Sequence, residues 1–157
     1  MIRDPVNTSA SERAQPRTAG HLAGPARSTI HRYQPPGGKI AAHVEIVVDA
    51  VDADRLAAFW AAALGYRAHG RFRQYRSLVD PDGAGPKVII QQVDEPKSAK
   101  NRVHLDVHTG DVEAEVERLV VLGATRLDPL PIAEAGTSWV RMCDPDGNEF
   151  CVCAQAR

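Results

Sequence analysis

Side chains that can bind metals or exchange protons occupy alternate positions in several short segments of the chain. In RVHLDVH, residues 102–108, two histidines and an aspartate alternate with valine and leucine. In NEFCVC, residues 148–153, a glutamate and a cysteine alternate with phenylalanine and valine. A solvated strand face draws more often on lysine, threonine and serine, so these residue types favour a binding or catalytic face. The side chains that share such faces are His43, Glu45, Gln91, His104, Asp106, Trp139, Arg141, Glu149 and Cys151.

Strand periodicity indicates which side of each segment these residues occupy. In the segment 43–48, HVEIVV, the residues at positions 44, 46 and 48 are valine or isoleucine, so His43 and Glu45 point the other way. The last predicted hairpin has its own apolar set, opposite Trp139 and Arg141. Each apolar set needs a partner to cover it, and an amphipathic helix has one stripe to bury. If the two halves of the chain join their sheets into one curved surface, the polar sets line its concavity; the alternative is a solvated face.

Two amphipathic helices are predicted to cover the apolar strand faces. The first begins at Asp52, a good N-cap residue, and ends at Gly65, and the second begins at Asp111. Their apolar stripes are Leu56, Phe59, Trp60, Ala63 and Leu64 in the first helix, and Val112, Val116, Leu119, Val120 and Leu122 in the second.

The tetrapeptide DPDG occurs twice, 64 positions apart, each time between two predicted strands. Other landmarks repeat at a similar spacing: the Leu-Gly pairs that end the helices are 58 positions apart, and Glu45 and His104 are 59 apart. Asp, Pro and Gly suit a tight turn, so DPDG is interpreted as the last hairpin turn of each repeat. The sequence therefore predicts an α+β fold of two βαβββ modules.

Composition separates this repeat from the front of the chain. Residues 1–38 are rich in Pro, Gly, Ser, Thr, Ala and Arg and have no hydrophobic period, so we expect a disordered or loosely packed tail. Residues 39–157 are expected to form the folded domain. Module one spans about 40–94 and module two about 101–154.

Charge and hydropathy exclude several classes of function. A net charge of −1 gives no basis for nucleic-acid binding, and no apolar run is long enough to predict a membrane span. No secretory signal is recognised, so a cytoplasmic location is expected. The three cysteines are an odd number in that setting and are expected to be free thiols.

The paired modules, together with LAAFWAAALGY, NRVHLDV and DPDGNEF, resemble the vicinal oxygen chelate superfamily. That group includes glyoxalase I, bleomycin-resistance proteins and extradiol dioxygenases, and the chain is most similar to its glyoxalase-like branch. The resemblance covers about residues 40–154. It implies a curved, incomplete mixed β-barrel with the helices outside, and a homodimer.

In metal-using members of that superfamily, four ligands come from the first and last strands of each module. Transferred by motif, the resemblance implies the ligands Glu45, Gln91, His104 and Cys151, with His43 and Glu149 as alternates. Cys151 stands where metal-using members normally have glutamate. This donor set suits a divalent transition metal, zinc, nickel, manganese or iron, better than magnesium or calcium. A protein without a metal is the alternative.

Two functions follow from these candidates. As an enzyme, the chain would act as a lyase, isomerase or dioxygenase on an oxygenated metabolite, with Glu45 and His104 as catalytic residues. The substrate-binding candidates are Asp106, Trp139 and Arg141. As a bleomycin-resistance-like protein, it would bind a small molecule or antibiotic without chemistry. From the residues alone, Glu45 could instead pair with Arg141, and Asp106 could orient a neighbouring side chain or bond Arg102 or Arg141.

Overall fold

The computed structural model describes residues 43–155, so the tail predicted at 1–38 lies outside the described residues. Both helices begin where the sequence predicts, because an aspartate carboxylate caps each one. Asp52 accepts a hydrogen bond of 3.0 Å from the Arg55 N–H at the start of α1 (Ala53–Leu64), and Asp111 caps α2 (Val112–Val121) in the same way. Gly65 ends α1 with a φ of 68°, in the left-handed region that favours glycine.

Module one folds into a four-stranded sheet in which the first and last strands are neighbours. The strand order is β1-β4-β3-β2, with β1 parallel to β4 and the other neighbours antiparallel. The first DPDG closes the β3–β4 hairpin, as predicted. The strands are β1 Glu45–Ala50, β2 Arg67–Phe72, β3 Tyr75–Val79 and β4 Lys87–Gln92.

Module two repeats this topology with one addition. Its order is β5-β9-β8-β6, with β5 parallel to β9, and a further short strand, β7, pairs with β8. β7 was not predicted, because three residues are too few to show a period. The strand predicted at 102–108 begins only at Asp106, so His104 precedes it. The strands are β5 Asp106–Thr109, β6 Thr125–Arg126, β7 Ile132–Glu134, β8 Thr137–Cys143 and β9 Glu149–Ala154.

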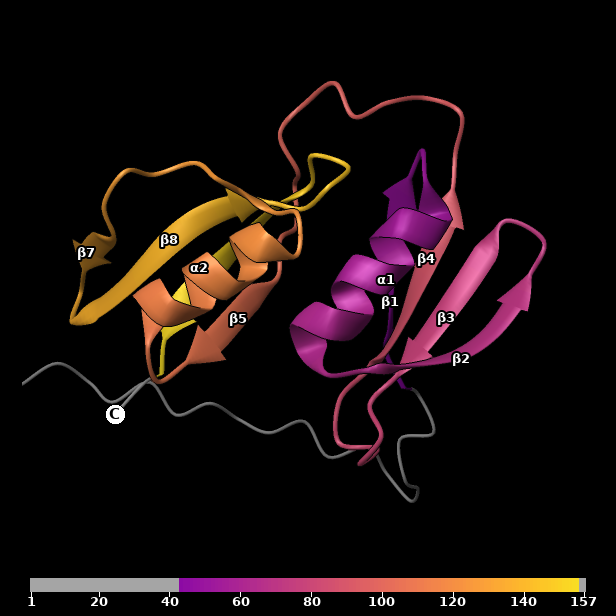
Figure 1. Cartoon of the computed structure of the whole chain (residues 1–157), viewed down its shortest axis with the longest axis horizontal. Helices are drawn as coiled ribbons and strands as arrows, with labels where there is room; N and C mark the ends of the chain where they lie inside the picture. The colour runs from indigo at the N-terminus through magenta and orange to yellow at the C-terminus, as the bar shows by residue number, and fades with distance from the viewer. Residues whose placement is uncertain (1–42, 156–157) are drawn as a thin grey trace, which may run out of the picture. The chain divides into compact units, whose positions relative to one another are not determined.

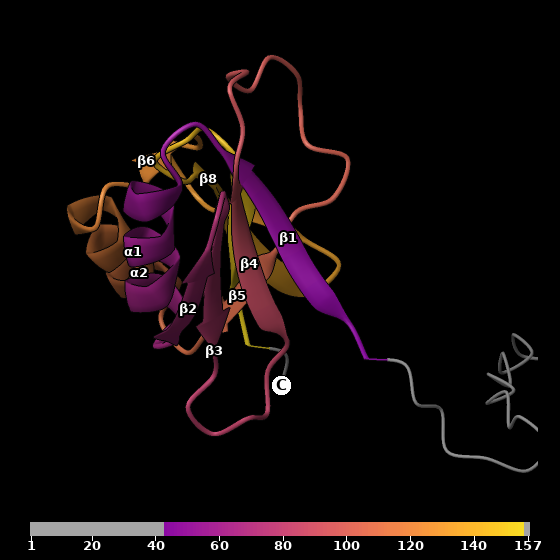
Figure 2. The same cartoon turned by 90° about the vertical axis from the view of Figure 1, so that its right-hand side faces the viewer.

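The two sheets remain separate in the described part of the chain, and no closed barrel forms. Helix α1 lies against β1, β3 and β4, and α2 lies against β6, β8 and β9 (Figure 1). Both helices occupy the same side of the strands (Figure 2). The predicted α+β fold of two incompletely joined βαβββ modules is therefore confirmed.

The predicted apolar faces form the core between helices and strands. In the last hairpin, Val140, Met142, Phe150 and Val152 are at most 1% exposed. The stripe of α1 is confirmed, but that of α2 is narrower than predicted, since Val120 is 45% exposed. Among residues 43–155, no helix is long and apolar enough to cross a membrane.

The second DPDG joins the two modules as well as closing a hairpin. The Trp60 indole N–H on α1 donates to the buried Asp144 carboxylate at 3.1 Å. Asp146 accepts from the Val51 backbone N–H, and its neighbour Pro145 offers a carbonyl to the Arg55 guanidinium at 2.7 Å. The sequence indicated only the turn, because turn chemistry is local while these partners are more than 80 positions away.

Candidate functional site

One face of the β5-β9-β8 sheet collects most of the predicted site residues. Leu105, Val107 and the alternate residues of β8 and β9 pack into the core, which turns their neighbours to the opposite face. We call this opposite surface the site face. Strand register arranges it in rows: Arg141, Cys151 and Asp106 stand abreast, and Trp139, Cys153 and His108 form the next row. Its other members are Cys143, Glu149 and His104.

His104, Asp106 and Cys151 come together on the site face. His104 Nδ1 lies 2.9 Å from Asp106 Oδ1, and the three residues offer ligand atoms that all lie within 4.8 Å of one another. Both His104 and Asp106 are about half exposed, so the group is open to solvent. An imidazole, a carboxylate and a thiol in this grouping are a donor set that suits zinc.

The Cys151 thiol is held in its protonated form. Burial, followed by the charge of Asp106, raises the pKa of Cys151 to about 11. At neutral pH this thiol is a poor nucleophile, since the thiolate is the reactive form. As a metal ligand it would have to lose its proton to the incoming ion.

Arg141 is anchored by an aspartate that sequence patterns did not indicate. Asp128 is buried and accepts from Arg141 Nη2 at 2.6 Å, from Nε, and from the Arg141 backbone N–H at 2.9 Å. The hydrogen bonds from Arg141 hold the pKa of Asp128 below its usual range. The Arg141 side chain remains about half exposed, so it can meet an anionic ligand. Asp128 lies in an irregular segment with no periodicity, and no sequence signal would have found it.

Glu149, an alternate metal ligand, is already fully engaged. Its two carboxylate oxygens accept from the Asn101 backbone N–H at 3.0 Å and pair with Lys97 Nζ at 2.9 Å. The Asn101 hydrogen bond and the Lys97 partner lower the pKa of Glu149 to about 2. Glu149 thus fastens the segment that connects the modules to β9, and an ion would have to displace Lys97 to use it.

We expect Glu149→Gln to lower the free energy of unfolding by about 1–2 kcal/mol at pH 7, because it removes a charge-assisted network. Because the pKa of Glu149 is lower in the folded protein than in the unfolded chain, its ionised form stabilises the fold at pH values above about 4.5. This contribution to stability is lost as the pH falls toward 2. Urea unfolding at pH 7, 5 and 3 should therefore show the deficit shrinking with acid. Glu134→Gln, at an exposed position of β7, is the matched control. A deficit that stays constant with pH would contradict the assignment.

The predicted ligands of module one are not brought together. In the parallel register, Glu45 stands beside Lys87, whereas Gln91 stands beside Asp49. Four residues separate the two positions, about 13 Å along the sheet. Glu45 pairs with Lys87 Nζ at 3.1 Å and lies 3.8 Å from His43 Nε2, so its partner is not Arg141. Likewise, the partner of Asp106 is His104, neither Arg102 nor Arg141.

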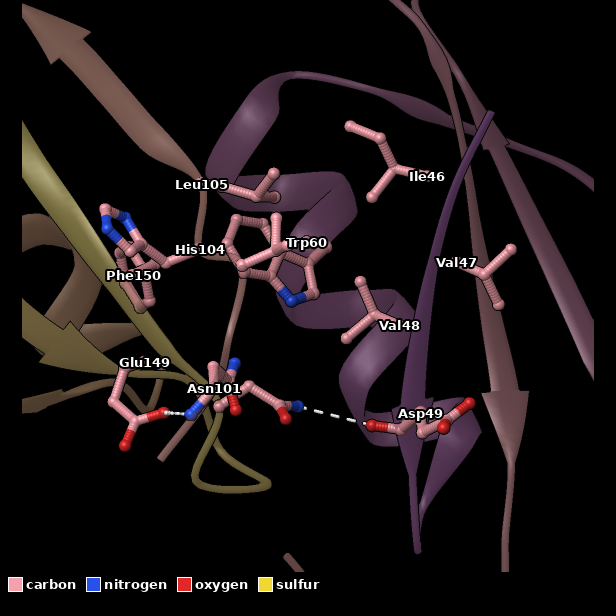
Figure 3. Close-up of a pocket in the computed structure, with 12 residues that line it drawn as sticks. Ile46, Val47, Val48, Asp49, Trp60, Asn101, His104, Leu105, Glu149 and Phe150 are labelled. Atoms are coloured by element: carbon pink, nitrogen blue, oxygen red, sulfur yellow. Dashed lines mark hydrogen bonds between the residues drawn. The ribbon is translucent and has the colours of Figure 1, made fainter. Parts of the chain in front are cut away.

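The edges of the two sheets face each other across a seam that is lined mainly by apolar side chains. A cavity of about 210 Å³ lies there, and Ile46, Val48, Trp60 and Leu105 turn toward it (Figure 3). His104 is part of its lining. A second, open cavity of about 550 Å³ also includes Ile46 and Leu105 and extends to Asp106 and His108. Of the site-face residues, His104 therefore borders the first cavity, and Asp106 and His108 border the second.

Comparison with known proteins agrees with this architecture. A family model described as a glyoxalase-like domain matches residues 45–153. A search of curated proteins finds no match.

Solved structures with similar folds come from several bacteria. The fosfomycin resistance protein FosX from Listeria monocytogenes is 17% identical, with a TM-score of 0.61, and the match covers 75% of this chain and 96% of that one. A glyoxalase/bleomycin resistance protein/dioxygenase family enzyme from Burkholderia phytofirmans is 15% identical, with a TM-score of 0.60, covering 70% and 95%. FosX from Mesorhizobium loti is 16% identical, with a TM-score of 0.58, covering 75% and 95%. At these identities the likeness shows the fold alone.

Proposed function

The chain belongs to the glyoxalase-like domain family, and from that premise we propose that it acts on a small, oxygenated, anionic metabolite with the help of one divalent transition metal. The observation that carries the proposal is the grouping of His104, Asp106 and Cys151, whose ligand atoms lie within 4.8 Å of one another. Zinc fits this set best, because nitrogen and sulfur donors favour it over magnesium and calcium.

Asp106 can serve the proposed site in two ways. It can bind the ion directly, or it can accept the proton on His104 Nδ1, from which it lies 2.9 Å, and leave Nε2 for the ion. The second arrangement is common among metal-bound histidines, because the carboxylate fixes the ring and its tautomer. In either case Cys151 supplies a thiolate on the neighbouring strand.

The surrounding residues account for binding of the metabolite. Arg141 stands beside Cys151 in the register and presents a half-exposed guanidinium to an anionic group. Trp139, in the next row of the same strand, offers a flat surface for stacking. Asp128 holds Arg141 in place, so its contribution is positioning.

Proton transfer next to a carbonyl is the chemistry that these groups support best. Lewis-acid polarisation of a ligand oxygen is what a bound ion would supply. Glu45 is the general base that we propose from the family resemblance; its carboxylate pairs with Lys87 Nζ at 3.1 Å and would have to leave this lysine to accept a proton. Lyase, isomerase and dioxygenase reactions all remain compatible with this assignment, since a fold does not select among them.

A binding protein without chemistry is the second candidate, and a specific observation favours it. Glu45 pairs with Lys87 and Glu149 pairs with Lys97, so two of the predicted carboxylate ligands already form ion pairs with lysines. In this alternative the site face would sequester a small molecule without turning it over.

Metal content of the full chain tests the proposal. The protein is incubated separately with zinc, nickel, manganese and iron(II), desalted, and analysed by mass spectrometry. We expect the protein to bind zinc, and the zinc content of His104→Ala and of Cys151→Ser should each be lower than that of the wild type by about one equivalent per chain. Cys143→Ser is the matched control, because Cys143 is a thiol of the same face that does not belong to the group of His104, Asp106 and Cys151. Absence of every metal would overturn the proposal and leave the binding protein.

A further inference from the structure

A second group of ligand types lies one side-chain step further along the site face. His108 and Cys153 are neighbours in the parallel register of β5 and β9, and Asp106 stands two residues before His108. Their ligand atoms also lie within 4.8 Å of one another. His108 and Cys153 are distinct from His104 and Cys151, so the two groups share only Asp106. Successive side chains on one face are about 7 Å apart, which leaves room for two separate ions.

The hydrogen bond that His108 makes leaves one ring nitrogen available to an ion. Its Nδ1 lies 3.3 Å from the backbone carbonyl oxygen of Ala154. A carbonyl only accepts, so Nδ1 carries the proton and, in the neutral imidazole, Nε2 is left with its lone pair. In many metal-bound histidines, a hydrogen bond from the ring nitrogen that does not bind the metal fixes the tautomer in this way.

Cys153 is a buried thiol. It is only 8% exposed, and no hydrogen bond to its sulfur occurs among residues 43–155. Burial, followed by the charge of Asp106, raises the pKa of Cys153. Its neighbours across the strands are His108 on one side and Trp139 on the other. The thiol thus stands beside an imidazole and close to a carboxylate.

Two of the three proposed ligands are open to solvent. Asp106 and His108 are exposed and line the open cavity of about 550 Å³. A set of three protein ligands leaves a fourth position for water or a small ligand, as in open zinc sites.

We propose that Asp106, His108 and Cys153 form a second site for a thiophilic divalent ion such as zinc. It is separate from the site assigned to His104 and Cys151, and the Asp106 carboxylate, with two oxygens, serves both. Binding would release the Cys153 proton to solvent as the sulfur–metal bond forms. The proposal does not depend on catalysis by either site, but the sharing of Asp106 rests on the proposed function.

Cobalt(II) titration of the full chain under anaerobic conditions tests it, because thiolate-to-cobalt absorption counts the thiolates that bind. We expect two equivalents of cobalt and two thiolates in the wild type. His108→Ala and Cys153→Ser should each lose one equivalent and one thiolate, and should keep the equivalent that depends on Cys151. The control Cys143→Ser should keep both. Circular dichroism checks that each variant is folded.

The possible results separate the two metal assignments. One equivalent that vanishes in His104→Ala and persists in Cys153→Ser would overturn the second site and leave the proposed function intact. One equivalent that vanishes in Cys153→Ser and persists in His104→Ala would support the second site and overturn the first. A single equivalent lost in both variants would mean one shared site, and that result also overturns the proposal.

Discussion

Asp144→Ala is expected to lower the free energy of unfolding by about 3–5 kcal/mol, the largest stability loss predicted for any turn residue of this chain. Asp144 is 2% exposed and is the acceptor for four donors. These are the Trp60 indole N–H at 3.1 Å, the backbone N–H groups of Asp146 and Asn148, and the Asn148 side-chain amide. Alanine would leave these donors without an acceptor and would open the contact between α1 and the second hairpin.

The first DPDG supplies a matched control. Asp80 has the same position in its turn and accepts from the backbone N–H groups of Asp82, Ala84 and Gly85. All three are local, and Asp80 is only half-buried, so Asp80→Ala is expected to cost much less stability than Asp144→Ala. Chemical unfolding of both variants measures the difference. Equal losses would show that Asp144 acts only within its turn.

The pH dependence adds a second check on Asp144. Burial raises the pKa of Asp144, so the folded protein holds this proton more tightly than the unfolded chain does. The resulting stability is present at low pH and is lost as pH rises through the folded-state pKa. Asp144→Asn cannot titrate, so its deficit relative to the wild type should be smaller at pH 7 than at pH 3. Glu149→Gln should show the opposite trend.

The two DPDG segments illustrate what can be predicted from this sequence. Local chemistry indicated the turn and the repeat, and strand parity placed Arg141 and Cys151 on one face, because both signals lie within a few residues. The link from Asp144 to Trp60 spans 84 positions and depends on how the modules pack. No local pattern contains that information.

The alternation of side chains predicts which face of a strand a residue occupies, but it does not predict which residues of neighbouring strands lie side by side. It placed Glu45 and Gln91 on the same face, yet the register sets them about 13 Å apart. Lys87 stands beside Glu45 and pairs with it, but a lysine in a strand is usually a solvated residue, so its type gives no signal of this contact. The second histidine–cysteine pair did have a signal: Cys151 and Cys153 alternate with Val152, which places both sulfurs on the site face.

Cys151→Glu is expected to shift the metal preference of the first site from zinc toward manganese by about 10–100-fold, because a carboxylate is a harder ligand than a thiolate. Cys151 stands between Arg141 and Asp106 in the register, so a new carboxylate there would gain one favourable and one repulsive neighbour. Competition titrations of zinc against manganese measure the ratio. Cys143→Glu, a change outside either group of ligands, should leave it unchanged.

The Cys151→Glu variant also tests whether the Cys151 sulfur binds the metal or is only a buried side chain. Because burial keeps the pKa of Cys151 at about 11, zinc binding by the wild type must displace a proton, and its affinity should rise by up to about tenfold per pH unit between pH 6 and 8. Cys151→Glu binds without that proton loss, so its affinity should depend less steeply on pH. If both proteins show the same slope and the same zinc-to-manganese ratio, the Cys151 sulfur is not a ligand. The departure from the family's usual glutamate would then favour the binding protein over the metalloenzyme.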